Sequence, residues 1–117
     1  MILIDASQEI IIAKEVRDAT TFWQRLLGLL GKKDLSVEQG LIIEPCKIVH
    51  TFFMKFALDI IFLNQRDRVV NIIENMPPNR ISPFINEAQV VVELKAGVSK
   101  NKEIRLGNKI ISKKNKE

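Results

Sequence analysis

The residues best suited to chemistry lie together in residues 45–62, PCKIVHTFFMKFALDIIF. This segment holds the only cysteine of the chain, Cys46, its only histidine, His50, together with Met54 and one carboxylate, Asp59. Cysteine, histidine and methionine side chains bind soft metal ions such as Cu(I) or Zn²⁺. A cysteine beside a histidine can instead act as a nucleophile, because the imidazole takes the thiol proton. The segment therefore raises two hypotheses, a metal site and a thiol nucleophile.

The spacing of these residues argues against a metal site. Cys46, His50 and Met54 recur every four residues, which on a strand separates their side chains by about 13 Å. A helix would bring them to about 5–6 Å, but the β-branched residues within 48–51 disfavour a helix. The chain has no second cysteine or histidine to complete a ligand set. We expect no bound metal and no cofactor.

The thiol hypothesis depends on a bend. Cys46 reaches His50 only if the chain turns after Pro45, and the neighbouring Lys47 would then favour the thiolate. The alternative is that Cys46 packs as a small hydrophobic residue, which is common for a free cysteine. We prefer packing. A single cysteine cannot form an internal disulfide, which is typical of a cytoplasmic protein.

Two carboxylates stand inside apolar runs. Asp59 lies between Leu58 and Ile60, and Glu93 lies between two further apolar residues. They could meet across a sheet as a general acid–base pair. They could equally accept backbone N–H bonds at strand ends, or pair with Arg25 or Arg80.

Hydrophobic patterning supplies the elements that must position these residues. The Ile- and Val-rich runs predict strands at 9–16, 40–45 and 88–97, and a hairpin whose strands 58–64 and 68–75 are joined by QRD. Gly107 and Asn108 predict the turn of a last hairpin over residues 102–112. Apolar residues at three- and four-residue spacing predict one helix over 20–31, with Asp18 as its N-cap.

These elements predict a mainly β (α+β) fold. We expect a compact antiparallel β-barrel or sandwich of roughly six to eight short strands, with one helix in the N-terminal half. Residues 1–112 would form a single globular domain, followed by a basic C-terminal tail, residues 113–117. If residues 45–62 stay extended, the even positions form an almost wholly apolar face that includes His50.

The net charge of +4 is unevenly distributed. Residues 95–117 contain eight basic and two acidic residues, a balance of +6, whereas residues 1–94 have a balance of −2. Basic residues on a C-terminal end without interleaved aromatic residues are not typical of nucleic-acid binding, which we do not expect. The N-terminus lacks the basic residues of a signal peptide, and no apolar run is long enough for a membrane span.

Several motifs together resemble a known family, the domain of unknown function 192. The resemblance rests on RLLGLLGKKDL (25–35), GLIIEPCKIVHTFFMKFALDIIFLN (40–64) and VVVELKAG (90–97) followed by RLGNKI. The positions that match the family pattern are Arg25, Gly28, Leu29, Pro45, Cys46, His50, Thr51, Met54, Asp59, Glu93 and Gly97. The resemblance implies a small, mainly β domain and no established activity.

The chain departs from that pattern at three positions. Phe53 stands where the family usually has a small residue, often glycine, and Ala57 stands where it has proline. Asn108 replaces an aspartate. The pattern also implies a bend near residues 55–57, which would bring His50 towards Asp59.

We therefore expect an uncharacterised small domain that acts as a non-enzymatic ligand-binding, peptide-binding or accessory module. Peptide addition to an exposed strand edge is the favoured mode. The alternative is a small hydrolase or thiol enzyme that uses Cys46 and His50 or Asp59 and Glu93, and a third hypothesis is a purely structural network. The candidate pocket or polar network consists of Arg25, Cys46, His50, Thr51, Met54, Asp59 and Glu93.

Overall fold

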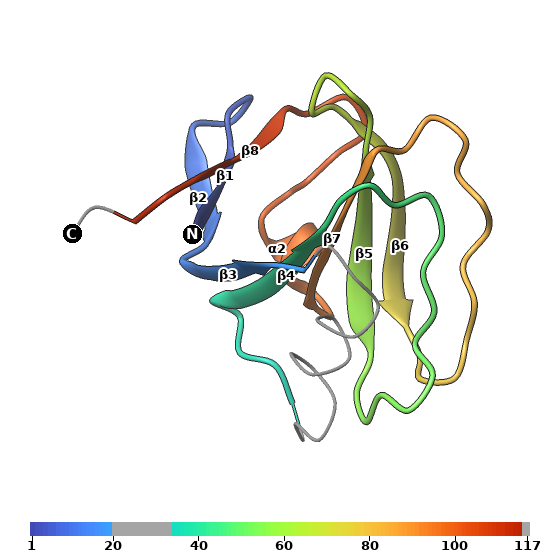
Figure 1. Ribbon diagram of the computed structural model, residues 1–117. Helices are drawn as coiled ribbons and strands as arrows, with labels where there is room; N and C mark the ends of the chain where they lie inside the picture. The colour runs from blue at the N-terminus through green and yellow to red at the C-terminus, as the bar shows by residue number, and fades with distance from the viewer. Residues whose placement is uncertain (20–33, 116–117) are drawn as a thin grey trace.

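The structure, a computed structural model, describes residues 1–19 and 34–115 and contains two sheets (Figure 1). The smaller sheet has the strand order β2 (Ile10–Ala13), β1 (Ile2–Asp5), β8 (Ile110–Lys113). The larger has the order β3 (Glu15–Asp18), β4 (Gln39–Ile43), β7 (Val90–Lys95), β5 (Leu58–Leu63), β6 (Val69–Met76). One short helix, α2 (Val98–Asn101), follows β7. No helix among the described residues is long and apolar enough to cross a membrane.

The mainly β prediction is confirmed, and the two sheets form an open sandwich and not a closed barrel. The hairpin of β5 and β6 around QRD is confirmed, as are the strands at β4 and β7. One pair differs from the antiparallel expectation, because β3 and β4 run parallel. A parallel pair needs a long crossover connection, and the stretch between Asp18 and Gln39 is long enough to supply one.

Three other predictions are not confirmed as they were made. The predicted helix over residues 20–31 lies outside the described residues. The predicted strand 9–16 is broken at Lys14 into β2 and β3, which belong to different sheets. The predicted hairpin over 102–112 is wrong: β8 pairs with β1, and residues 107–108 exchange backbone hydrogen bonds with Val69 at the start of β6. These long-range partners replace the local pairing that the glycine turn suggested.

The larger sheet is buried on both faces. On one face it packs against the smaller sheet, through a core that includes Leu3, Ile61, Val92, Leu94 and Ile110. Its other face carries a second core that includes Leu41, Leu58, Ile60, Phe62 and Val91. Burial on both faces explains why β5 and β7 are nearly continuous apolar runs in the sequence.

The alternation predicted for residues 45–62 holds only in β5. There Leu58, Ile60 and Phe62 enter the second core, and Ile61 enters the first. Residues 44–57 form a loop and not a strand, so the predicted parity is wrong for them: Ile48 is exposed and Val49 is buried. The loop does bend at residues 55 and 56, as expected.

Candidate functional site

The structure distributes the predicted site residues over two strands and one loop. Cys46, His50, Thr51 and Met54 lie in the loop 44–57, Asp59 lies in β5 and Glu93 lies in β7. Arg25 lies outside the described residues. Among the described residues, no three His, Cys, Asp or Glu side chains are grouped so that they could hold a metal ion.

Asp59 and Glu93 point to opposite faces of the larger sheet. Asp59 pairs with Leu94, whereas Glu93 pairs with Ile60 and Leu41. Paired residues share a face and successive residues alternate, so Asp59 lies on the face of the first core and Glu93 on that of the second. Both are fully buried, and Glu93 makes at least one polar or electrostatic interaction. Their predicted meeting as an acid–base pair is wrong.

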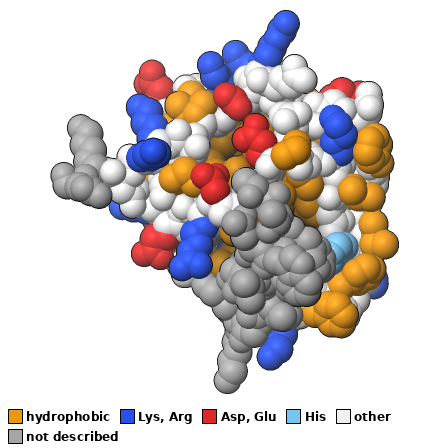
Figure 2. Space-filling model, viewed as in Figure 1, with side chains coloured by type: hydrophobic (Ala, Val, Ile, Leu, Met, Phe, Trp, Pro, Cys, Tyr) orange, Lys and Arg blue, Asp and Glu red, His pale blue; other side chains and the backbone are white. Residues whose placement is uncertain are grey.

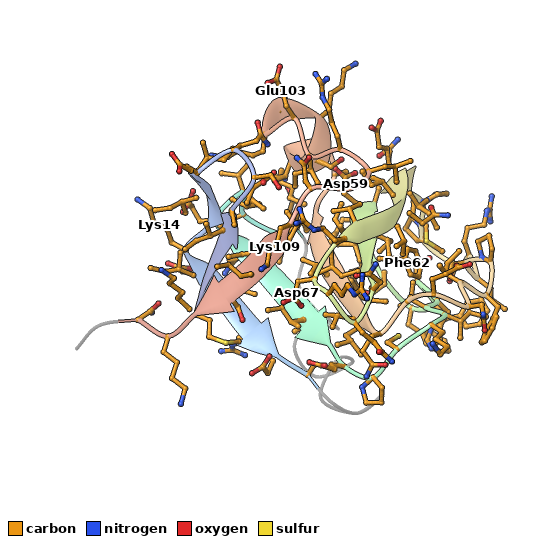
Figure 3. The ribbon with its side chains drawn as sticks, turned by 90° about the horizontal axis from the view of Figure 1, so that it is seen from above. Lys14, Asp59, Phe62, Asp67, Glu103 and Lys109 are labelled. Carbon is orange, nitrogen blue, oxygen red and sulfur yellow. The ribbon has the colours of Figure 1, made fainter. Side chains whose placement is uncertain are left out.

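Asp59 instead anchors the backbone at one end of the sheet (Figure 3). Its Oδ2 accepts hydrogen bonds from the N–H of Gly97 (3.0 Å), the N–H of Ser99 (3.0 Å) and the Ser99 hydroxyl (2.6 Å). Its Oδ1 accepts one from the N–H of Asn75 (2.8 Å). The carboxylate therefore serves as a distant cap for α2, whose own N-cap residue Gly97 makes no side-chain bond.

Two of the three backbone positions that Asp59 holds are left-handed. Gly97 has φ +98° and Asn75 has φ +54°. Asn75 lies where the register between β5 and β6 shifts, so it forms a bulge. The expectation that a buried carboxylate accepts backbone N–H bonds is therefore confirmed for Asp59, and its four hydrogen bonds do not include His50.

Thr51 braces the loop 44–57 against the loop 77–89. Its side chain is fully buried, and its hydroxyl donates to the Pro77 carbonyl (2.6 Å) and accepts from the Arg80 N–H (3.0 Å). Its own N–H donates to the Arg80 carbonyl (2.8 Å), and its carbonyl accepts from Asn79 (2.9 Å). A single threonine thus makes four links between segments nearly thirty residues apart.

Further hydrogen bonds extend this brace along both loops. Val49 and Ser82 are joined by two bonds, one from each backbone N–H, and the Ile85 N–H donates to the Lys47 carbonyl (2.8 Å). The Lys47 ammonium donates to two carbonyls at the base of the second loop, those of residues 86 and 88. Because so many polar groups are used between the loops, we infer that the loops form one ordered unit.

His50 and Cys46 belong to the same unit. His50 is half-buried, its backbone forms a bridge with Ile81, and its Nδ1 accepts a hydrogen bond from the Phe52 N–H (3.2 Å). Its ring stacks on the ring of Phe52 at 4.8 Å. The Cys46 thiol donates to the Ile48 carbonyl (3.2 Å), and the partly buried side chain packs against the second core. Met54 is buried in that core.

Phe53 occupies a backbone position that favours glycine. It follows Phe52 in a tight turn closed by a bond from the Met54 N–H to the Thr51 carbonyl (3.2 Å), and its φ is +67°. A positive φ at this place in a turn normally selects glycine or asparagine. The phenylalanine is nevertheless 70% exposed, so the strained position is not offset by burial of its ring.

The two loops together carry a patch of exposed apolar side chains. Of the seven large hydrophobic side chains that are exposed in the described part of the chain, four lie here: Ile48 (46%), Phe53 (70%), Ile81 (60%) and Phe84 (61%). Figure 2 shows hydrophobic side chains gathered beside the histidine, on the side of the molecule where Figure 1 places both loops. We call these four residues, with the exposed Lys55 and Arg80, the loop face.

Sequence reasoning missed the half of the loop face that comes from residues 77–89. The three prolines of MPPNRISPF indicated only irregular structure. A usable signal was present, because Ile81 and Phe84 are large apolar residues in a segment that cannot form a strand or helix and bury them.

Three hollows lie elsewhere on the described surface. One of about 250 Å³ lies beside Asp59 and α2, and is lined by Asp59, Glu74, Asn75, Ala96, Gly97, Ser99 and Lys100. One of about 350 Å³ is lined by Lys47, by residues 64–66 of the β5–β6 turn and by residues 86–89 of the second loop. The third, about 420 Å³, lies between the sheets and has Asp18, Glu44 and Asp67 in its lining. None is lined by the four apolar residues of the loop face.

Solved structures share this fold. A protein of unknown function from Novosphingobium aromaticivorans superimposes with a TM-score of 0.79 and 24% identity, over 95% of this chain and 82% of that one. A putative transcription regulator from Sinorhizobium meliloti superimposes with a TM-score of 0.78 and 22% identity, over 94% and 89%. At these identities the likeness supports the fold alone.

Sequence comparisons give the family. UPF0127 protein PH1112 of Pyrococcus horikoshii is 30% identical over 111 residues, which cover 92% of this chain and 96% of that protein. UPF0127 protein PF1050 of Pyrococcus furiosus is 31% identical over 99 residues, or 82% and 84%. Residues 2–112 match the model of DUF192, described as "Uncharacterized ACR". The chain therefore belongs to the DUF192 family, as its motifs suggested.

Proposed function

We propose that the protein is a non-enzymatic binding module and that the loop face is its binding surface. One observation carries the proposal: four of the seven exposed large hydrophobic side chains in the described part of the chain lie on two adjacent loops. Scattered exposed apolar residues are ordinary, but a contiguous group of them is typical of an interaction site.

The brace makes this surface suitable for binding. Thr51, Ser82 and Lys47 fix the two loops to each other through buried or partly buried hydrogen bonds. Loops that are already ordered lose little conformational freedom when a partner binds. Covering the exposed halves of four large apolar side chains would contribute about 4–6 kcal/mol before the entropic cost of association.

Peptide addition to a strand edge, the mode favoured from the sequence, has weaker support. The outer strand β6 pairs with β5 only, but register shifts near Val70 and Asn75 interrupt it. The other outer strand of the larger sheet, β3, is four residues long and carries Glu15, Arg17 and Asp18. Bulges, charges and short length are the features that protect edges from further pairing.

The enzymatic alternative is reduced to its thiol version, because Asp59 and Glu93 occupy opposite faces of the sheet. A Cys46 nucleophile would require a depressed thiol pKa. The rate of Cys46 alkylation should be measured against pH in the wild type and in His50→Ala. A thiol that reacts with an ordinary pKa in both proteins supports the binding proposal, whereas a low pKa that rises in His50→Ala would favour the enzyme.

The proposal is tested with two matched pairs of substitutions. Phe53→Ser/Phe84→Ser removes the two rings of the loop face, and Ile11→Ser/Leu106→Ser removes two exposed apolar side chains elsewhere (42% and 67% exposed). Tagged wild type and both variants are compared for co-sedimentation with components of an extract from the source cells. We expect the wild type and the control pair to be retained and the loop-face pair to remain free.

Retention of the wild type does not by itself support the proposal, because it does not show which surface binds. Equal retention of the two variants would contradict it, and so would failure of all three proteins to be retained. Both variants should first be shown to unfold at the same urea concentration as the wild type, since exposed side chains contribute little to stability.

A further inference from the structure

Deepening the proposed function, on which this inference rests, we propose that the loop face docks on the surface of a lipid bilayer that contains anionic lipids. The protein would bind peripherally, with the tips of the loops 44–57 and 77–89 in the headgroup region.

The apolar side chains have the composition and exposure of a membrane-inserting surface. Phe53, Ile81 and Phe84 are each at least 60% exposed, and Ile48 is 46% exposed. Phenylalanine and aliphatic side chains enter the boundary between headgroups and acyl chains when a protein lies on a bilayer. Because these side chains are exposed on two adjacent loops, they are available for insertion into that boundary.

The charge of the loop face is complementary to an anionic surface. The sequence contains no Asp or Glu between Pro45 and Leu58, or between Asn75 and Asn86. The exposed cations Lys55 and Arg80 lie within two residues of Phe53 and Ile81. Each basic side chain near an anionic membrane strengthens binding about fivefold. Apolar tips flanked by cations and free of carboxylates match what such a membrane binds.

The backbone of the loops argues against a peptide partner. The N–H groups of Val49, Thr51 and Met54, and those of Asn79, Arg80, Ser82 and Ile85, already donate to groups within the two loops. Peptide recognition depends largely on main-chain hydrogen bonds or on a groove. A bilayer surface requires neither of them.

A second copy of the chain is also disfavoured. In a two-fold dimer the same surface would meet itself, which would bring two sets of Lys55 and Arg80 together. The only carboxylates in the two loops, Glu44 next to β4 and Glu87 shortly before β7, are not part of the loop face. Like charges placed opposite each other oppose association.

The basic C-terminal end does not belong to this surface. Figure 1 shows β8, which leads into that end, on the side of the molecule away from the loops 44–57 and 77–89. Lys14, labelled in Figure 3, lies with β2 and β3 on the same far side. Exposed cations there, such as Lys14 and Lys113, therefore provide controls for non-specific charge attraction.

The test measures binding of the full chain to vesicles by co-sedimentation. One set of vesicles contains phosphatidylcholine mixed with phosphatidylglycerol, and the other contains phosphatidylcholine alone. We expect tighter binding to the anionic vesicles, weakened by added salt. Phe53→Ser/Phe84→Ser should weaken it by about tenfold or more. Lys55→Glu/Arg80→Glu should weaken it by at least about 25-fold, because loss of the two positive charges alone accounts for that factor. The controls Ile11→Ser/Leu106→Ser and Lys14→Glu/Lys113→Glu should bind like the wild type.

The inference is overturned if the wild type binds both kinds of vesicle equally or neither, or if the control pairs lose as much affinity as the loop-face pairs. The result also separates the inference from the proposed function. Loss of vesicle binding together with extract retention that depends on Phe53 and Phe84 would remove the bilayer and keep the binding face, with a protein as its partner. Failure of both experiments would remove both.

Discussion

Replacing Asp59 by asparagine should destabilise the fold strongly while leaving the loop face intact. The carboxylate accepts four hydrogen bonds from the donors of Asn75, Gly97 and Ser99. An amide has one oxygen in place of two. If that oxygen takes the place of Oδ2 and keeps three bonds, the NH2 group faces the N–H of Asn75, which leaves two donors opposed.

The expected cost follows from these bonds. A buried donor left without a partner costs about 1–3 kcal/mol, and the remaining bonds lose the added strength of a charged acceptor. Relief of the buried charge offsets part of this loss. We expect Asp59→Asn to lower the free energy of unfolding by about 3 kcal/mol, a large share of the total of a small domain. Ser99→Ala, which removes only the hydroxyl, should cost about 1–2 kcal/mol.

Urea unfolding followed by far-ultraviolet circular dichroism measures both values. Asp34→Asn serves as the matched control, because that carboxylate is 66% exposed and its loss should have little effect. If Asp59→Asn costs less than about 1 kcal/mol, or if Ser99→Ala costs as much as Asp59→Asn, the anchoring role of the carboxylate is refuted. Folded Asp59→Asn should still bind vesicles like the wild type.

Three further predictions concern the loops and one ion pair. Phe53→Gly should raise the free energy of unfolding by about 0.5–1 kcal/mol, because glycine relieves the left-handed backbone strain and the exposed ring contributes little burial. Phe53→Ala keeps the strain and should not raise stability. Equal gains from the two substitutions would contradict this reason. Thr51→Val should cost about 1–3 kcal/mol and accelerate amide exchange in residues 46–54, while Thr51→Ser should preserve both; slow exchange in Thr51→Val would refute the brace. The hydrogen bond from Lys95 holds the pKa of Asp34 below its usual value. The pair therefore stabilises the fold at pH values above the usual pKa of an aspartate. This contribution is lost as the pH falls through the lowered pKa. The stability difference between the wild type and Lys95→Met should therefore be small at neutral pH and disappear in acid, and a difference that persists there would contradict the assignment.

Local patterns predicted the parts of the fold that have local causes. The β-rich runs on either side of QRD predicted the hairpin of β5 and β6, whose strands are neighbours in the chain. The buried run before Gly97 predicted β7, where the strand ends at Lys95 and Gly97 adopts a left-handed φ. Each of these features is set by residues close together in sequence.

The features that escaped prediction depend on distant partners. The parity argument assumed that residues 45–57 are extended, but they form a loop whose partners are the irregular residues 77–89. The carboxylate of Asp59 was expected near His50, yet its donors Gly97 and Ser99 lie about forty residues away in the chain. The spacing of residues in a single sequence does not identify such distant partners, because each contact depends on one side chain, either a threonine or a carboxylate.

The central claim, that the loop face is the surface through which this protein binds, is tested most directly by photochemical labelling in living cells. A benzoylphenylalanine residue is placed at position 84 in one protein and at position 106 in another. Phe84 and Leu106 are similarly exposed, at 61% and 67%, but only Phe84 belongs to the loop face. We predict covalent adducts from position 84 and few from position 106. Equal yields from the two positions, or no adduct from position 84, would contradict the claim.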